Sequence, residues 1–230
     1  IIRSNVIGTM NLLEYSRLHK ARRLLFISSS EVYGEDNLID GFSEEDSGKI
    51  DILNTRSCYS ESKRVSENIC INYYRQYGVD SVIVRPGHIY GAAITKDNSR
   101  ADAQFLRNAI NGQDIVMKSA GNQLRSYCYV TDAVTALLFV LLKGKSCEAY
   151  NIANKNSNAT IRQFAETLAT VNGVKIKFEN PEDEEKQGYS VFTNATLKPE
   201  KLEKLQWKPM YSLAEGVRDM VELFKGKPVI

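Results

Sequence analysis

Short apolar runs and longer amphipathic segments alternate along the first 90 residues. Residues 23–29 and 81–85 each contain a run of apolar side chains, which is typical of buried strands in a parallel sheet. Apolar positions at helical spacing predict a helix from a Ser4 cap to about Lys20 and a longer helix over residues 58–77. Helices and strands in this alternating order predict a parallel α/β sheet.

After Gly91 the pattern changes to shorter elements separated by polar segments. A mixture of this kind predicts a smaller α+β part. The acidic stretch at residues 180–185 predicts a solvated loop. The predicted helices cover residues 101–110, 131–142, 160–171, 199–205 and 213–224, and the predicted strands cover residues 115–117, 125–130 and 150–153.

Composition and charge narrow the class of protein. The 230 residues are 43% hydrophobic and 25% charged, as in an ordinary globular protein, and a net charge of +2 without a basic block argues against a nucleic-acid partner. The longest apolar run, residues 133–142, is too short to span a bilayer, and the N-terminus does not resemble a signal peptide. We therefore expect a cytoplasmic protein with no membrane partner.

The cysteines and histidines show neither a C-x-x-C motif nor the spacing of a metal site. Reduced, partly buried thiols in a cytoplasmic protein explain the cysteines without any special chemistry. We predict no bound metal. The residues concerned are Cys58, Cys70, Cys128, Cys147, His19 and His88.

Tyr59 and Lys63 lie four residues apart on a predicted helix, so the phenol and the ammonium project from the same face. A neighbouring cation favours the phenolate form, which general acid–base catalysis near neutral pH needs. Two ordinary surface neighbours would show the same spacing. The serines at residues 28–30 favour a functional role for the pair over that alternative, because they end a predicted strand. Ligands of open α/β sheets bind beyond the carboxyl ends of strands. A hydroxyl there could hydrogen-bond the substrate oxygen whose proton Tyr59 transfers.

Several segments match, in the same order, the motifs of one enzyme family. Together they resemble the extended short-chain dehydrogenase/reductase family, the NAD-dependent sugar-nucleotide epimerases, dehydratases and decarboxylases, over essentially the whole chain. The matching segments are residues 5–14 (the helix before the serine strand), 28–34 (S-[ST]-x-x-V-Y-G), 59–63 (the tyrosine–lysine pair), 85–91 (R-x-x-N-x-Y-G-P), 125–132 (R-[SD]-[FY]-x-[YH]-V-x-D) and 205–209 (L-G-W-x-P).

The resemblance implies an α/β fold with a doubly wound parallel Rossmann-type sheet, whose N-terminal half is missing here, and a smaller α+β substrate-binding lobe. Residues 1–91 would be the C-terminal half of the NAD-binding domain. Residues 92–230 would be mainly the substrate-binding lobe, with segments around 124–153 returning to the first domain. The family's G-x-x-G-x-x-G loop, whose amides hold the NAD pyrophosphate, is absent from this sequence. We therefore expect the chain to be part of a longer polypeptide.

The same resemblance implies the roles of single residues. Tyr59 would be the acid/base, Lys63 would bind the nicotinamide ribose, and Ser29 would hydrogen-bond the reacting hydroxyl of a nucleotide-diphosphate sugar. Bound NAD would oxidise that sugar to a 4-keto sugar. The implied catalytic residues are Ser29, Glu31, Tyr59 and Lys63, the cofactor-binding residues are Ser28, Tyr59, Lys63, Pro86 and His88, and the substrate-binding residues are Ser30, His88, Arg100 and Arg125.

Residues 30 and 31 bear on which reaction follows. Family dehydratases usually carry Asp-Glu there, so Ser30 argues against a standard 4,6-dehydratase. Ser30 with Glu31, and residues 56–64, are closer to the UDP-glucuronate decarboxylase pattern. Arg125 matches an arginine near the substrate carboxylate, and it would equally suit a diphosphate. We predict decarboxylation of a UDP-hexuronate ahead of 4-epimerisation, and 4-epimerisation ahead of dehydration.

Other interpretations stay open. Glu31 could orient a water or cap the loop, and His88, which replaces the family's asparagine, could be a partly buried histidine. The chain could be a catalytically inactive binding or assembly module, or a reductase that uses free NADPH. The predicted helices at residues 5–20 and 58–77 resemble the pair that forms a four-helix bundle between the subunits of family dimers, so we expect a homodimer.

Overall fold

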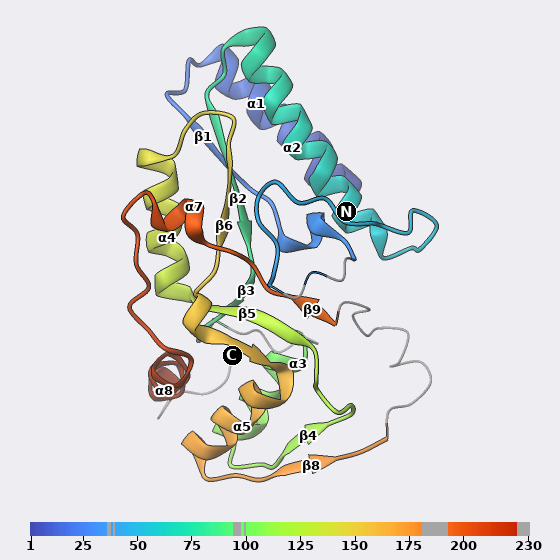
Figure 1. Ribbon diagram of the computed structural model, residues 1–230, viewed down its shortest axis with the longest axis vertical. Coiled ribbons are helices and arrows are strands. Elements are labelled where there is room, and N and C mark those ends of the chain that lie inside the picture. The colour runs from blue at the N-terminus through green and yellow to red at the C-terminus, as the bar shows by residue number, and fades with distance from the viewer. Residues whose placement is uncertain (36–37, 39, 94–97, 99, 181–192, 225–230) are drawn as a thin grey trace. The chain divides into compact units, whose positions relative to one another are not determined.

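A computed structural model describes residues 1–35, 38, 40–93, 98, 100–180 and 193–224 (Figure 1). The contacts divide the chain into two compact units. The first unit consists of Ile1–Gly87, Ala133–Ala153 and Thr196–Lys208. The second consists of His88–Asp132, Asn154–Ala195 and Pro209–Ile230.

The first unit contains a parallel sheet with the strand order β1-β2-β6. Its strands are β1 (Leu24–Ile27), β2 (Ser81–Pro86) and β6 (Ala149–Ile152). Leu24 pairs with Ser81, and Ile83 pairs with Ala149. The central strand β2 is buried on both faces, as the uninterrupted apolar run predicts for a parallel sheet. The prediction of an α/β protein with a parallel sheet is confirmed.

Two helices, α1 (Gly8–Leu18) and α2 (Ser57–Tyr77), lie together on one side of this sheet, and α4 (Val130–Lys143) lies on the other side (Figure 1). A core cluster that includes Leu13, Phe26, Cys70 and Ile83 joins α1 and α2 to the sheet. The helix α2 ends at Gly78, whose left-handed backbone (φ 70°) suits a residue without a Cβ.

The predicted Ser4 cap is wrong. Ser4 lies inside the π-helical turn η1 (Arg3–Ile7), which runs directly into α1. The backbone is already helical at Ile2, so Ser4 cannot occupy the extended conformation that a capping residue adopts.

In the second unit, β5 (Leu124–Tyr129) pairs with three strands. It is parallel to β3 (His88–Tyr90) and β9 (Asn194–Ala195) and antiparallel to β7 (Asn158–Thr160). The strands β4 (Ile115–Met117) and β8 (Ile176–Phe178) form a separate parallel pair. Sequence reasoning missed β3, β7, β8 and β9, which are two or three residues long and show no clear period. It found β4, also of three residues, because all three of its side chains are apolar.

Three helices, α3 (Ala101–Ile110), α5 (Ile161–Asn172) and α8 (Leu213–Phe224), complete the core of the second unit. Within it, Tyr127 of β5 stacks on Phe164 of α5, with ring centroids 4.7 Å apart. Thr160 caps α5, and its hydroxyl and Gln163 form the reciprocal hydrogen bonds of a capping box.

Short elements fill the remaining segments: η2 (Ser30–Tyr33), η3 (Lys155–Ser157) and α7 (Glu200–Glu203). The helix expected at residues 199–205 is therefore shorter than predicted. The expected acidic loop at residues 180–185 lies, apart from Asn180, outside the described residues. Residues 88–91 and 124–132 belong to the second unit and Thr196–Lys208 to the first, unlike the expected boundaries. That the two units bind cofactor and substrate respectively stays a prediction.

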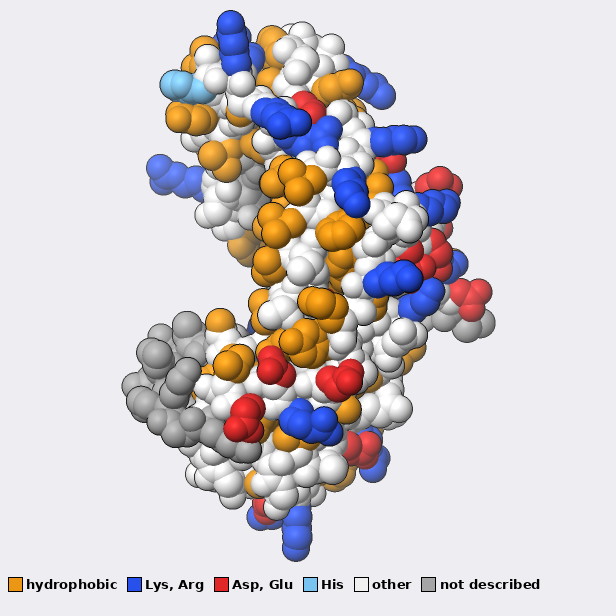
Figure 2. Space-filling view, turned by 90° about the vertical axis from the view of Figure 1, so that its left-hand side faces the viewer, with side chains coloured by type: hydrophobic (Ala, Val, Ile, Leu, Met, Phe, Trp, Pro, Cys, Tyr) orange, Lys and Arg blue, Asp and Glu red, His pale blue; other side chains and the backbone are white. Residues whose placement is uncertain are grey.

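Apolar side chains remain exposed on the helices of the first unit. On α4, Val134, Leu138 and Leu142 follow one another at every fourth residue and form one exposed stripe. Figure 2 looks onto the side of the molecule where α4 lies in Figure 1, and hydrophobic side chains gather there. Contiguous apolar surface of this kind is typical of interaction sites.

Candidate active site

The serine segment turns sharply at the carboxyl end of β1. Ser28 still belongs to the sheet, since its amide donates to the carbonyl of Val84 at 2.8 Å. Ser29 is extended, and its hydroxyl oxygen caps η2 by accepting a hydrogen bond from the amide of Glu31 at 3.2 Å. The turn ends at Gly34, where φ is 70° and an added Cβ would collide with the carbonyl of Lys49. The backbone thus presents Ser29 and Glu31 just beyond the strand.

Ser28 carries a buried hydroxyl that has no hydrogen-bond partner in the described part of the chain. The residue is only 4% exposed. A buried hydroxyl left unpaired costs free energy, about 1–3 kcal/mol, so it is a natural place for a ligand group to bind. This orphaned atom, with the ammonium of Lys63 of α2 at the end of β1, fits the nicotinamide end of NAD.

Lys63 brings its ammonium to the end of β1. Its Nζ donates to the carbonyl oxygen of Ile27 at 2.8 Å and lies 5.8 Å from the centre of the Tyr59 ring. Burial lowers the pKa of Lys63, and the carboxylate of Glu67 opposes that shift. The predicted tyrosine–lysine face of α2 therefore stands beside the last residues of β1.

A direct contact joins α2 to the serine turn. The hydroxyl of Ser60, next to Tyr59, donates to Oε2 of Glu31 at 3.3 Å. The structure thus gathers Ser28, Glu31 and Lys63 from the predicted set at one end of the first unit. Ser29 and Ser30 lie between Ser28 and Glu31 in the turn, and Tyr59 lies on the same helix face as Lys63. Pro86 ends the neighbouring strand β2.

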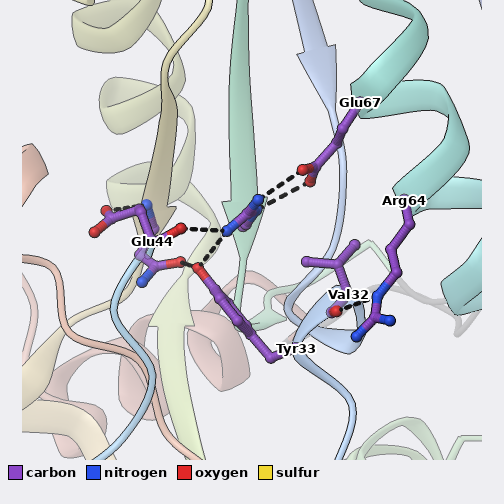
Figure 3. A network of polar contacts seen from close by, with 7 residues as sticks. Val32, Tyr33, Glu44, Arg64 and Glu67 are labelled. Carbon is purple, nitrogen blue, oxygen red and sulfur yellow. Dashed lines mark hydrogen bonds and ion pairs between the residues drawn. The ribbon is translucent and has the colours of Figure 1, made fainter. Parts of the chain in front are cut away.

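A buried ion pair connects the serine turn to the sheet and to α2 (Figure 3). Arg85 of β2 donates from Nε and Nη2 to the two carboxylate oxygens of Glu67, at 3.0 and 2.7 Å. Its Nη1 donates to the hydroxyl of Tyr33 and to the carbonyl of Glu44, each at 3.0 Å. Burial would lower the pKa of Arg85, but the hydrogen bonds that Arg85 donates to Glu67 and Tyr33 raise it overall. Arg85 is therefore a permanent cation that connects sheet, helix and turn.

The network continues into the loop after the turn. The hydroxyl of Tyr33 donates to the side-chain Oδ1 of Asn151 at 2.6 Å, and the backbone amide of Asn151 donates to Oε1 of Glu44 at 2.8 Å. Burial raises the pKa of the Glu44 carboxyl and of the Tyr33 phenol. Tyr33 is thus a structural phenol, held neutral, and not a second acid/base candidate.

The remaining predicted residues, His88, Arg100 and Arg125, belong to the second unit. His88 lies on the edge of the Tyr127 ring, and its Nε2 is 3.3 Å from Oδ2 of Asp102. One nitrogen of Arg100 is 3.3 and 3.2 Å from the two ring nitrogens of His88, which places the guanidinium over the imidazole face. Burial would raise the pKa of Asp102, but His88 and Arg100 lower it overall.

Arg125 is buried in β5, and its Nη1 donates to the carbonyl of Leu124 at 2.9 Å. Its charge and those of Arg100 and Asp102 all influence the pKa of Tyr127, which burial raises. Two guanidinium groups and one carboxylate of the second unit thus lie close enough to this phenol to influence its pKa.

Sequence reasoning did not predict the roles of several residues in this part of the structure. Glu67 could have been found, because it lies one helical turn after Lys63, on the face that carries Tyr59. Ser60 and Asp102 gave no such signal, since their partners Glu31 and His88 are distant in sequence. The same holds for Arg64, whose Nε donates to the carbonyl oxygen of Val32.

A cavity of about 260 Å³ runs along β1, lined by residues of η1, α1 and β1 and by Lys63. β1 pairs with β2 alone among the described strands, so its other edge has no strand partner there. In the described ranges, no three His, Cys, Asp or Glu side chains are grouped to hold a metal. No helix of the described chain is both long and apolar enough for a membrane span.

A serine turn after a parallel strand, with a tyrosine–lysine helix beside it, defines an α/β protein of the short-chain dehydrogenase/reductase class. The model of the NAD-dependent epimerase/dehydratase family matches residues 1–153. The chain belongs to this family, whose members include NAD-dependent nucleotide-sugar epimerases, dehydratases and decarboxylases.

Curated relatives include UDP-glucuronic acid decarboxylase 5 of Arabidopsis thaliana, 36% identical over 227 residues, or 97% of this chain and 64% of the relative. UDP-glucuronic acid decarboxylase 1 of Xenopus tropicalis is 29% identical over 228 residues, or 97% of this chain and 52% of the relative. The chain thus spans only about half to two thirds of the length of these proteins.

Solved structures with the same fold include two different enzymes. The dTDP-glucose 4,6-dehydratase of Bacillus anthracis, in complex with NAD, matches with a TM-score of 0.83 at 25% identity, over 98% of this chain and 69% of that one. The UDP-glucose 4-epimerase of Thermotoga maritima, with UDP-glucose, matches with a TM-score of 0.85 at 25% identity, over 97% and 70%. Because both match about equally well, the fold alone does not select the reaction.

We expect Arg85→Met to lower the free energy of unfolding by about 3 kcal/mol, because it leaves the carboxylate of Glu67 buried without its partner. The side chains of Arg85 and Glu67 are only 14% and 11% exposed. Urea denaturation of the purified protein measures the change. Arg17→Met, which breaks the exposed pair with Glu14, should hardly move the midpoint. Equal midpoints for the two variants would contradict the importance of the buried pair.

Proposed function

We propose that this chain carries the acid/base residues of an NAD-dependent nucleotide-sugar enzyme, and that the reaction is decarboxylation of a UDP-hexuronate. The observation that carries the proposal is the placement of Lys63, with Tyr59 on the same helix face, against the end of β1, where Ser29 and Glu31 form the turn. The reaction is chosen on sequence: the Ser30–Glu31 pair, and a relative named as a UDP-glucuronic acid decarboxylase at 36% identity.

The residues have separate roles in this proposal. Tyr59 accepts the proton of the sugar C4 hydroxyl, Ser29 hydrogen-bonds the same oxygen, and the ammonium of Lys63 stabilises the phenolate. When bound, NAD supplies the oxidation at C4 and its later reversal. Ser28 and Lys63 would hold the nicotinamide end, together with Pro86 and His88 as further contacts. The substrate would be held by Ser30, His88, Arg100 and Arg125.

The ketone at C4 makes the rest of the reaction feasible. A carboxylate on C5 is then β to a carbonyl, so the C–C bond breaks with its electron pair delocalised into an enolate as carbon dioxide leaves. Arg125 suits recognition of that carboxylate, because a guanidinium binds a carboxylate through paired hydrogen bonds. Glu31, held by Ser60, would serve the protonation that completes the step.

Two other reactions share the 4-keto intermediate. A 4-epimerase would return hydrogen to the opposite face of C4, and a 4,6-dehydratase would expel the hydroxyl at C6. The solved relatives with these activities support both as second candidates. A catalytically inactive binding module is the alternative from another class, and loss of turnover on removing one phenol oxygen distinguishes it from the enzyme.

In the complete polypeptide, Tyr59→Phe should abolish turnover while leaving NAD binding intact, because the ring stays and only the proton-transferring oxygen is lost. Ser29→Ala should lower kcat by about 100-fold, as for loss of one positioned donor. Steady-state kinetics and a fluorescence titration with NADH measure the two effects. Exposed Tyr74→Phe, on the same helix, is the matched control. More than about a tenth of the activity left in Tyr59→Phe would remove Tyr59 from the mechanism.

With UDP-glucuronate and NAD, the complete polypeptide should release carbon dioxide and form the UDP-pentose. Arg125→Lys should impair this reaction, because a lysine keeps the charge but loses the paired geometry, whereas exposed Arg162→Lys should not. Labelled carbon dioxide and nucleotide-sugar chromatography give the readouts. Dehydration of dTDP-glucose, or interconversion of UDP-glucose and UDP-galactose, would replace the decarboxylase by one of the other two reactions.

The proposed homodimer uses the outer face of α1 and α2. In both helices one face packs on the sheet, as for Leu13 in the core, while Leu12, Tyr15 and Tyr74 stay exposed. Two such pairs could bury these side chains in a four-helix bundle. Sedimentation of the complete polypeptide should give a dimer at micromolar concentration. Leu12→Asp should yield monomers, and Leu142→Asp, on the exposed stripe of α4, should leave the dimer intact. A monomeric parent protein would refute the interface.

A further inference from the structure

Arg64 follows Lys63 on α2, but its guanidinium contacts other backbone carbonyls than the carbonyl of Ile27 that Lys63 contacts. Its Nε donates to the carbonyl oxygen of Val32 at 2.7 Å, and its Nη2 donates to the carbonyl oxygen of Gly48 at 2.9 Å. Figure 3 shows the guanidinium reaching from α2 to Val32 in the turn. One planar side chain thus bridges the serine turn and the loop that follows it.

The two carbonyls belong to a closed backbone unit. The amide of Gly48 donates to the carbonyl of Tyr33 at 2.8 Å, and Glu35 and Lys49 exchange two hydrogen bonds of 2.8 and 3.0 Å. An added Cβ at Gly48 would collide with the carbonyl of Tyr33, so the two strands of chain lie in close contact. Arg64 therefore holds a small rigid unit and not two independent loops.

The contacts of α2 with the turn come from one stretch of the helix. Lys63 holds Ile27 before the turn, Ser60 holds Glu31 inside it, and Arg64 holds Val32 near its end. Of these three, only Arg64 contributes two N–H donors in a fixed planar geometry. A rotation or a slide of α2 that moved Tyr59 relative to Ser29 would break both of its hydrogen bonds.

We propose that Arg64 is a positioning residue, which sets the phenol of Tyr59 and the hydroxyl of Ser29 in the geometry that proton transfer needs. The inference rests on the proposed function, in which these two groups act on one substrate oxygen. Arg64 acts through its geometry, because a lysine would retain the charge but could not donate to both carbonyls at fixed angles. A displacement of about 1 Å can reduce a rate by about 100-fold.

The test compares Arg64→Lys and Arg64→Met with the parent in the complete polypeptide. We expect kcat to fall by about 10- to 100-fold in both variants, with KM within about threefold and the pH profile of kcat/KM unchanged. Amide hydrogen exchange should accelerate at residues 31–35 and 48–49, while the core amides of β2 keep their protection. Glu61→Gln is the matched control: it removes the ion-pair partner 3.6 Å from Arg64 and leaves both carbonyl bonds, so kcat should stay within about twofold.

Three results would overturn the proposal. One is a parental kcat in Arg64→Lys, which would show that the charge is sufficient. Another is a shifted pH profile in Arg64→Met alone, which would show an electrostatic role. The third is faster exchange throughout the first unit, which would show a general loss of stability. If the parent turns over no nucleotide sugar, the proposed function fails. Hydrogen exchange then still decides whether Arg64 holds the turn against α2.

Discussion

The guanidinium of Arg85 is the group on which the geometry of the first unit depends. It stands in the central strand, pairs with Glu67 of α2, and donates to Tyr33 at the end of the serine turn and to Glu44 in the following loop. A buried cation is tolerated only when its donors are satisfied, and the partners of Arg85, namely Glu67, Tyr33 and Glu44, come from three separate segments. Sheet, helix and turn cannot move independently without leaving a buried charge unpaired.

This constraint explains how weak individual contacts can define a reactive geometry. The hydrogen bond from Ser60 to Glu31 is 3.3 Å long, and that from Glu31 to Ser29 is 3.2 Å, so neither is strong alone. These two hydrogen bonds keep their geometry because Arg85 and Arg64 fix the segments that carry the donors and acceptors. The buried hydroxyl of Ser28 has no hydrogen-bond partner among the residues that the structure describes, and it is the kind of polar group that is retained where a ligand pairs with it.

Membership of the family and the identity of the reaction rest on different physical features. Membership of the family follows from the match over residues 1–153, which include the sheet, the turn and the tyrosine–lysine face. In the proposed function, these features serve the oxidation at C4 that all three reactions share. In the same proposal, the choice of reaction depends on which group acts on the neighbouring carbon, and Ser30 in place of aspartate argues against dehydration. That an epimerase and a dehydratase superpose equally well on this chain agrees with this separation.

The sequence alone was sufficient for the sheet, for α2 and its end at Gly78, and for the pairing of Tyr59 with Lys63, because apolar runs, helical spacing and glycine punctuation are local properties. It misassigned Ser4, since a cap depends on where the backbone first becomes helical. It also missed the roles of Arg64, Glu67 and Asp102. Their partners lie 32, 18 and 14 residues away, and no local pattern records a hydrogen bond or ion pair over such a distance. Only the tertiary structure could decide them, because burial and direction determine which partner a long charged side chain finds.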